Sequence, residues 1–520
     1  MSDPVDDWQT AQEAELNDPS ALAHLARFDA VATEAPGIIN LGQDLAAVVR
    51  LGACREATDL GDLIDRVVAT GARPVGLLDS LRFRPLDDPA TKDSLPTVVA
   101  GLGAYARQHG VPIVGGELSF ESGESEPLIT ALGVGIVSRD DLRPTDDPAS
   151  DTEPRPFARP GWIDALNAQD ANRLPRDNAP DAQRAMLLRI VASPTLCDKS
   201  WVTDQFDRYA GGHTVLAQPE DAGMLRVDVA TGVGLALTLD SRPRMAALNP
   251  YLGAQHALAE AYRNVAATGA RPRAVATHLA AGNPDDPQIM WQFVEMVLGL
   301  VDGCGELGTP VADRSGSFAR GTGDARPLPT PLVAMIGVID DVARRTPMGF
   351  AEPGDEIWLL GETREELSGT VWADVAHDGH LGGMPPRIDF AAEKRLAAVL
   401  GEAARAEVLV SAHDLAEGGL AQALVESCLR RGFGAEIDLG GGDPTVELYA
   451  ESTARVLVSL PGERVGELRA LADKHDVPLR RLGSVAGDGA KAALQIEGLF
   501  TISLVELRGA RAATLPTALS

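Results

Sequence analysis

The sequence of 520 residues has few of the residues that mark secreted or disulfide-linked proteins. It contains 4 cysteines, far apart at positions 54, 197, 304 and 428, with no Cys-x-x-Cys motif. This pattern excludes a disulfide framework and a cysteine zinc site, and it fits a reducing compartment. Aromatic residues make up only 4% of the chain, while glycine occurs 53 times, so we expect cores packed from small and aliphatic side chains.

Positive charge and long apolar runs are also scarce. The 46 Lys and Arg residues stand against 75 Asp and Glu, for a formal net charge of −29. An excess of acid spread along the chain argues against binding to nucleic acid or anionic membranes. The N-terminus is acidic and lacks the apolar core of a signal peptide, and the longest apolar run, near residues 332–339, is too short to span a bilayer. The sequence therefore predicts a cytoplasmic protein.

The chain does contain an internal repeat. Residues 65–74 (DRVVATGARP) match residues 263–272 (RNVAATGARP) at an offset of 198. Two further matches fall in the same register, 111–112 with 309–310 and 119–120 with 317–318. Three matches in one register predict two copies of one α/β unit.

Each copy has the same pattern of elements. A helix ends at Gly71 or Gly269, an apolar strand follows, and a second helix leads to two more strands. A proline-rich stretch separates the copies, and the region after Phe350 has no duplicate partner. We therefore expect an N-terminal extension (1–40), a first unit (41–141), a linker (142–185), a second unit (186–348) and a C-terminal domain (349–512).

Oxygen-bearing side chains stand at positions that suit a metal site. Glu260 and Asn264 are four residues apart in a predicted helix, so both leave the same face. Asp414 follows an apolar strand, and Asp221 and Asp240 stand at the ends of others. Such oxygens are suitable Mg²⁺ ligands. A solvated helix face and ordinary turns are the alternative interpretations.

Several stretches together resemble phosphoribosylformylglycinamidine synthase, of the aminoimidazole ribonucleotide synthase superfamily. Those in the second half are SPTLCDKSWVTDQFDRY, NPYLGAQHALAEAYRNVAATGARP, SAHDLAEGGLAQALVES and LYAESTARVLVSL; those in the first copy are GARPVGLLDSLRF and GVPIVGGELSFE. The resemblance implies an α/β fold in which two N-type domains pair face to face as an internal pseudo-dimer. A C-type domain follows the second N-type domain here, and the one expected after the first is missing.

The resemblance also implies a reaction. The family uses ATP and Mg²⁺ to activate the amide oxygen of formylglycinamide ribonucleotide, and ammonia from a separate glutaminase then displaces the phosphate. The family also has a second nucleotide site, which in large members holds a nucleotide structurally. Positions matching that second site are Asp221, Glu260, Asn264 and Asp414 for metal, and Asp221, Ala222, Asp414 and Ala416 for ATP or tightly bound ADP. The family's serine after HDL is Ala416 in this chain.

The family's catalytic site is altered in this chain. Its histidine-rich segment is absent, and Arg66, Thr277 and Ser315 replace expected metal ligands, although Asp62 keeps a carboxylate. Ser317 survives as a substrate contact and, with His413, is a candidate for a catalytic role. The remaining candidates are His278 and His413 for acid–base roles, and Arg314, Arg320 and Arg326, around a glycine-rich loop, for a substrate phosphate. A packing role for the histidines and a plain surface loop are the alternatives.

Three functional hypotheses follow. The chain is a synthetase of purine biosynthesis supplied with ammonia by a separate glutaminase; or a non-catalytic, nucleotide-binding scaffold or partner subunit; or an enzyme repurposed for another small molecule. The internal pseudo-dimer makes a monomer sufficient, and a homo-oligomer remains the alternative.

Overall fold

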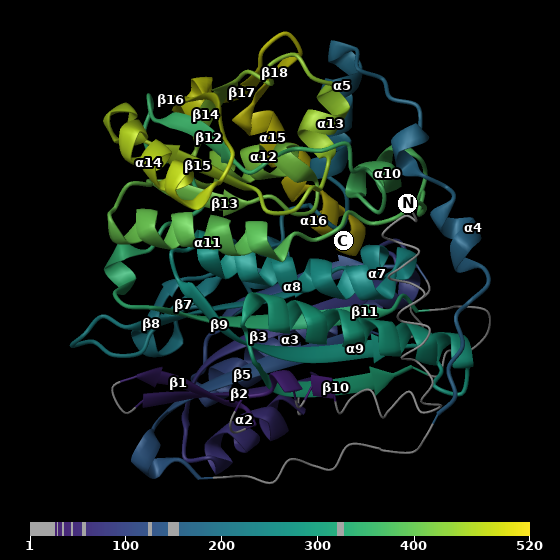
Figure 1. Ribbon diagram of the computed structural model, residues 1–520, viewed down its shortest axis with the longest axis vertical. Helices are drawn as coiled ribbons and strands as arrows, with labels where there is room; N and C mark the ends of the chain where they lie inside the picture. The colour runs from purple at the N-terminus through teal and green to yellow at the C-terminus, as the bar shows by residue number, and fades with distance from the viewer. Residues whose placement is uncertain are drawn as a thin grey trace.

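The computed structural model describes residues 27–28, 30–33, 36–42, 45–54, 59–122, 127–143, 155–319 and 327–520. These residues form three sheets with helices on their faces (Figure 1). The first sheet has the strand order β1-β2-β5-β3-β4 and the second β10-β9-β11-β8-β7-β6. Their strands are β1 (Ile38–Gly42), β2 (Leu45–Cys54), β3 (Arg73–Phe83), β4 (Ile113–Phe120), β5 (Leu128–Ser138), β6 (Thr214–Leu216), β7 (Gly223–Arg226), β8 (Gly234–Ser241), β9 (Arg271–Ala281), β10 (Val311–Phe318) and β11 (Thr330–Ile339).

The third sheet belongs to the C-terminal part of the chain and has the order β13-β15-β12-β16-β14-β17-β18. Its strands are β12 (Glu356–Leu360), β13 (Ser411–Asp414), β14 (Phe433–Ile437), β15 (Val456–Leu460), β16 (Leu479–Asp488), β17 (Ala493–Ile496) and β18 (Phe500–Ser503). The helices around it are α10 (Val371–Ala376), α11 (Phe390–Arg405), α12 (Gly419–Arg431), α13 (Pro444–Tyr449), α14 (Val465–His475), α15 (Leu504–Ala512) and α16 (Thr514–Leu519).

The first two sheets have the same topology, so the predicted duplication is confirmed. The order β4-β3-β5-β2-β1 recurs as β10-β9-β11-β8-β7. The pair β3–β4 is parallel, as is β9–β10, and the other pairs are antiparallel in both copies. Helix α2 (Asp59–Ala69) corresponds to α8 (Pro250–Ala267), and α3 (Pro89–His109) to α9 (Pro287–Leu307). Gly71 and Gly269 both have φ 86°, the left-handed turn that the repeat predicted.

The two sheets pack face to face, as expected for an internal pseudo-dimer. One apolar cluster draws side chains from both of them, and most of its members are fully buried. Removing this surface from water holds the copies together. The members that make the contact include Ala47, Val49, Leu78, Leu132 and Val134 from the first sheet, and Leu235, Leu237, Ala276, Ala334 and Ile336 from the second.

Helices α2 and α8 differ in what covers their outer faces. On α8, Ala266 and Ala267 are buried against Leu396 and Val399 of α11, which lies beside α8 in Figure 1. On α2, residues 62 and 65 are exposed aspartates, and Val68 is 48% exposed. The polar outer face of α2 fits a first copy that has no C-type domain packed on it.

The segment between the copies is more structured than its proline content suggests. From residue 155 it forms α4 (Ile163–Asn167) and α5 (Pro180–Val191), followed by α6 (Ser200–Thr203) and, after β8, α7 (Pro243–Leu248). Pro180 occupies the first turn of α5, where it costs no hydrogen bond. Helix α5 buries its apolar side on the C-terminal sheet through Leu187, Ile190 and Val191.

The chain also returns to the first copy at its C-terminal end. Leu515 of α16 is fully buried among first-copy side chains that include Leu60 and Leu63. None of the described helices has the length and apolar character needed to cross a membrane. The domain boundaries given above stay a prediction.

Candidate functional site

The candidate site is a cavity of about 520 Å³ where the three sheets meet. The first copy contributes Glu117 at β4, and the second contributes Asp221 before β7 and Glu260 on α8. The C-terminal part contributes Asp414 at the end of β13 and Arg511 on α15. Residues far apart in the sequence therefore share one enclosure, as expected for a ligand site between domains.

Asp221 and Asp414 meet at the boundary between the second sheet and the C-terminal sheet. The backbone N–H of Asp414 donates to Oδ2 of Asp221 at 3.1 Å. Nδ1 of His413 lies 2.5 Å from the other Asp221 oxygen, and its Nε2 lies 3.1 Å from Glu426. Ligand atoms of Asp221, His413 and Asp414 lie within 4.8 Å of one another, the one such group among the described residues.

His413 holds the Asp221 side chain in position and is not itself a metal ligand. Burial opposes the charged imidazolium, but Asp221 and Glu426 outweigh it and raise the pKa of His413 well above its ordinary value. Because Nδ1 faces Asp221 and Nε2 faces Glu426, neither ring nitrogen is left for a metal. His413 therefore orients Asp221, and the candidate acid–base role is not needed to explain its position.

Asn264 and Glu260 project from α8 toward the same region. Nδ2 of Asn264 donates to Asp240 at 2.8 Å, while Glu260 pairs with Arg242. Oδ1 of Asn264 and Oδ2 of Asp414 are buried without a hydrogen bond. Leaving two such oxygens unsatisfied is costly unless a ligand occupies the site.

Positive charge near these carboxyl groups is limited: Arg263 lies 3.8 Å from Oδ2 of Asp414 but is also paired with Glu393. Burial, with Asp221 nearby, raises the pKa of Asp414 to about 7. Burial, with Glu260 nearby, raises the pKa of Asp240 well above its ordinary value. A divalent cation would keep these carboxyl groups ionised. It would also coordinate the two oxygens without a hydrogen bond, Oδ1 of Asn264 and Oδ2 of Asp414. The oxygens of Asp221, Asn264 and Asp414 are therefore of the type that Mg²⁺ binds, while Glu260 is paired with Arg242.

The other residues predicted for the nucleotide lie nearby. Ala416 lines the cavity. Ala222 adjoins Asp221 and is buried in the second-copy core, so only its backbone can face a ligand. Asp414 and Asp221 thus lie together with Ala416, as the resemblance implies, while their roles stay a prediction.

The residues predicted for substrate phosphate lie elsewhere. Ser317 on β10 contacts His278, at 2.9 Å, and Arg314 places its guanidinium over the ring of Phe28, at 5.8 Å. Neither lines the cavity. Arg320 and Arg326 fall outside the described residues.

In the second copy, the side chain of His278 on β9 bonds to side chains of the neighbouring strand β10. The ring of His278 bonds to the Ser315 hydroxyl at 2.8 Å and to that of Ser317 at 2.9 Å. His278 and Thr277 are 1% and 0% exposed. The side chains of His278, Ser315 and Ser317, which replace or flank expected metal ligands, thus satisfy one another's hydrogen-bonding groups.

Sequence reasoning missed the contribution of the first copy. Asp79 and Glu117 correspond by the offset of 198 to Thr277 and Ser315, yet Glu117 lines the cavity and both residues line a smaller space next to it. It also missed Arg242, whose guanidinium lies 3.1 Å from Glu451 and 3.6 Å from Glu417. Carrying the repeat offset through both copies would have singled out Asp79 and Glu117.

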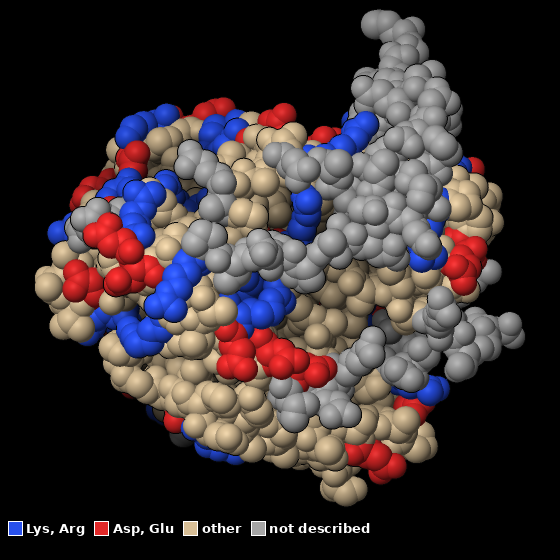
Figure 2. Space-filling view, turned by 90° about the horizontal axis from the view of Figure 1, so that it is seen from below, with Lys and Arg blue, Asp and Glu red and all other residues tan. Residues whose placement is uncertain are grey.

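Surface charge does not indicate a nucleic-acid interface on the face shown in Figure 2. There, blue and red side chains are interspersed among the described residues, and they form no continuous basic surface. Sequence-independent binding to phosphate backbones depends on such a surface.

Known families and relatives match most of the chain. The N-terminal domain family of AIR synthase related proteins matches residues 60–137 and 219–339, and the C-terminal domain family matches residues 352–494. Phosphoribosylformylglycinamidine synthase subunit PurL of Cutibacterium acnes is 36% identical, over 93% of this chain and 88% of its own length. The PurL of Leifsonia xyli is 50% identical, over 69% of this chain and 48% of its own length.

Solved structures share the fold. Phosphoribosylformylglycinamidine synthase II of Thermotoga maritima has a TM-score of 0.60 at 18% identity, covering 89% of this chain and 94% of that one. T. maritima PurL has also been solved in complexes with FGAR, ATP and ADP, and as PurLQS, at TM-scores of 0.58 to 0.60. At this identity the likeness concerns the fold alone.

Proposed function

Because the chain belongs to the phosphoribosylformylglycinamidine synthase family, we propose that its cavity binds ATP or ADP together with Mg²⁺. The observation that carries the proposal is that Oδ1 of Asn264 and Oδ2 of Asp414 are both buried without a hydrogen bond, while the backbone of Asp414 contacts Asp221. Mg²⁺ held there would neutralise phosphate charge. The chain itself supplies the enclosure and orients Asp221 through His413.

The reaction that best fits the family is ATP-dependent amide activation. The amide oxygen of formylglycinamide ribonucleotide would take the terminal phosphoryl group of ATP, and ammonia from a separate glutaminase subunit would displace phosphate to leave the amidine. T. maritima relatives were solved with FGAR and with ATP, which supports this substrate pair.

A second candidate function is a nucleotide-binding scaffold. The closed arrangement of His278 with Ser315 and Ser317 favours it, because those positions correspond to substrate and metal contacts in the family's reaction. In that case the bound nucleotide stabilises the fold without being consumed.

One experiment separates these outcomes. Freshly purified protein is denatured, released nucleotide and metal are identified by mass spectrometry, and phosphate release is assayed with ATP, formylglycinamide ribonucleotide and ammonium. Substrate-dependent phosphate release supports the synthetase, and stoichiometric ADP without turnover supports the scaffold. Absence of nucleotide, with no binding of added MgADP, contradicts both.

A matched pair of variants tests the site itself. Asn264 and Arg66 occupy the same position in the two copies. We expect Asn264→Ala to lose the nucleotide and Arg66→Ala to retain it. Equal nucleotide content in the two variants would contradict the metal assignment.

A further inference from the structure

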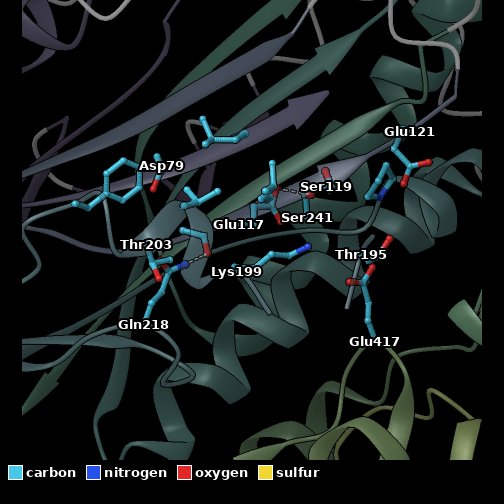
Figure 3. Close-up of a pocket in the computed structure, with 16 residues that line it drawn as sticks. Asp79, Glu117, Ser119, Glu121, Thr195, Lys199, Thr203, Gln218, Ser241 and Glu417 are labelled. Atoms are coloured by element: carbon cyan, nitrogen blue, oxygen red, sulfur yellow. Dashed lines mark hydrogen bonds between the residues drawn. The ribbon is translucent and has the colours of Figure 1, made fainter. Parts of the chain in front are cut away.

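An inner chamber of about 210 Å³ adjoins the nucleotide cavity (Figure 3). Glu117, Lys199, Ser241 and Glu417 line both spaces, so the two are adjacent. Asp79 and Ser119 line only the inner one. Its volume is several times the roughly 30 Å³ that one water occupies in the liquid, so it has room for a small organic molecule.

Two polar groups of the inner chamber receive no hydrogen bond from any other described side chain: the Asp79 carboxylate, which accepts from its own backbone N–H, and the Ser119 hydroxyl. Asp79 is 5% exposed, and among the described residues no other side chain donates a hydrogen bond to its carboxylate. The Ser119 hydroxyl is buried without a hydrogen bond. Unsatisfied groups of this kind at a cavity wall are expected where a ligand completes them.

The corresponding strand ends of the second copy show what a closed arrangement looks like. There, Thr277 replaces Asp79, Ser315 replaces Glu117, and His278 spans Ser315 and Ser317. In the first copy Ser80 stands in place of His278, and its hydroxyl donates to Glu117 at 2.7 Å. The shorter side chain leaves the space open, and carboxylates line it.

The charged side chains that line the inner chamber indicate which class of ligand it can bind. Its carboxylates are those of Asp79, Glu117, Glu121 and Glu417, and its one Lys or Arg is Lys199. The Lys199 ammonium already donates to the Pro194 carbonyl. Arg242 already lies 3.6 Å from Glu417, whereas none of the described Lys or Arg residues pairs with Asp79. Ionised carboxylates would repel a phosphate group, whereas a protonated amine would favour their ionised forms.

A lone metal ion fits less well than an amine. Among the described residues, the group of His, Cys, Asp and Glu ligand atoms gathered closely enough for a metal is Asp221, His413 and Asp414. The inner carboxylates are spread around a wider space. They suit a molecule with several atoms, one of them a charged nitrogen.

We propose that the inner chamber binds a small molecule that carries a protonated amine and no phosphate, beside the nucleotide. The amine contacts Asp79 and Glu117, and the rest of the molecule points toward the nucleotide cavity through the shared wall of Ser241 and Glu417. This assignment rests on the proposed nucleotide site and adds a second ligand to it.

The test uses glycinamide and its neutral isostere propionamide, titrated by calorimetry into the full chain loaded with MgADP. We expect glycinamide to bind at least about tenfold more tightly than propionamide, since only glycinamide carries the ammonium group. Ribose 5-phosphate should not bind in the chamber. Equal affinity for the two amides, or Asp79-dependent binding of ribose 5-phosphate, overturns the proposal.

Variants locate the binding. Asp79→Asn should weaken glycinamide binding about tenfold and leave MgADP affinity unchanged, and Glu117→Gln offers a second reading if the first variant folds poorly. The control is Asp62→Asn, which removes the same charge from exposed α2. Equal effects of Asp79→Asn and Asp62→Asn would count against the chamber.

The two proposals fail separately. If the wild-type chain does not bind MgADP, the proposed function is contradicted. Glycinamide binding can then still be measured by titrating the nucleotide-free chain. Normal MgADP binding without glycinamide binding would contradict only the inner-chamber assignment.

Discussion

Nδ1 of His413 lies 2.5 Å from Oδ1 of Asp221, across the boundary between the C-terminal and second sheets. The other ring nitrogen contacts Glu426, and Glu426 in turn accepts a hydrogen bond from Arg511 of α15 at 2.6 Å. A continuous series of contacts thus connects a C-terminal helix to a proposed metal ligand. Partners of this kind fix the orientation of ligands and tune their affinity.

The first prediction concerns this series. His413→Gln removes the charged partner of Asp221, so MgADP affinity should fall by about ten- to one hundred-fold, the usual cost of losing a partner behind a metal ligand. Calorimetric titration with MgADP measures it. The control is His475→Gln, which alters the contact with Glu402 at 3.0 Å, remote from the cavity. Wild-type affinity in His413→Gln would show that Asp221 needs no such support.

The second prediction compares equivalent positions in the two copies. Arg263 on α8 is 2% exposed and pairs with Glu393, which is 0% exposed, whereas Asp65, at the same position on α2, is exposed. Arg263→Ala leaves a buried carboxylate without its partner and should lower the free energy of unfolding by about 3–5 kcal/mol. Asp65→Ala should change it by less than about 0.5 kcal/mol.

Urea denaturation of both variants measures these two values. A similar loss of stability in Asp65→Ala and Arg263→Ala would mean that a further domain or chain covers α2. That result would contradict the view that the first copy has lost its C-type partner and adapted to solvent.

Much of the fold could be predicted because the repeat fixes it. The offset of 198 placed the helix ends at Gly71 and Gly269 and paired α2 with α8 before any coordinates. The metal candidates Asp221, Asn264 and Asp414 were found through local motifs and the family resemblance. The structure places Asp221 and Asp414 on one cavity, and Asn264 donates a hydrogen bond to Asp240 of the same lining.

The rest depends on contacts that no local pattern records. Glu117 reaches the second-copy site, and Asp79 the chamber next to it, because the two sheets pack face to face. Leu515 looks like any apolar residue near a chain end, yet it docks on the first copy. The acid–base role of His278 stays a prediction, but its contacts with Ser315 and Ser317 join side chains 37 and 39 residues apart, which no local pattern indicates.

The third prediction concerns the C-terminal end. Leu515→Ala removes a fully buried side chain from the first-copy core and should cost about 2–5 kcal/mol of unfolding free energy. Thermal and urea denaturation measure it. The control is Val505→Ala on α15, where the side chain is 69% exposed and little change is expected. An unaffected Leu515→Ala variant would mean that α16 does not dock in solution.

The last prediction concerns pH and follows from the burial of His278. Burial lowers the pKa of His278 from 6.5 to about 4. Below pH 6.5 the unfolded chain therefore takes up a proton at this position that the folded chain refuses. Stability attributable to His278 is fully present above pH 6.5 and falls as the pH drops toward 4, by up to about 1.4 kcal/mol per pH unit.

Replacing His278 with Gln keeps hydrogen-bonding capacity for the two serines and removes the titration. We expect the unfolding free energy of His278→Gln, measured in urea at several values between pH 7.5 and pH 4.5 (about one unit apart), to decline less steeply than that of the wild type. His256, whose pKa is lowered to about 3 by burial, is present in both proteins, so the difference between the two curves isolates His278. Parallel curves would mean that His278 is protonated in the folded chain, and the strand ends of the second copy would then have to be open to water.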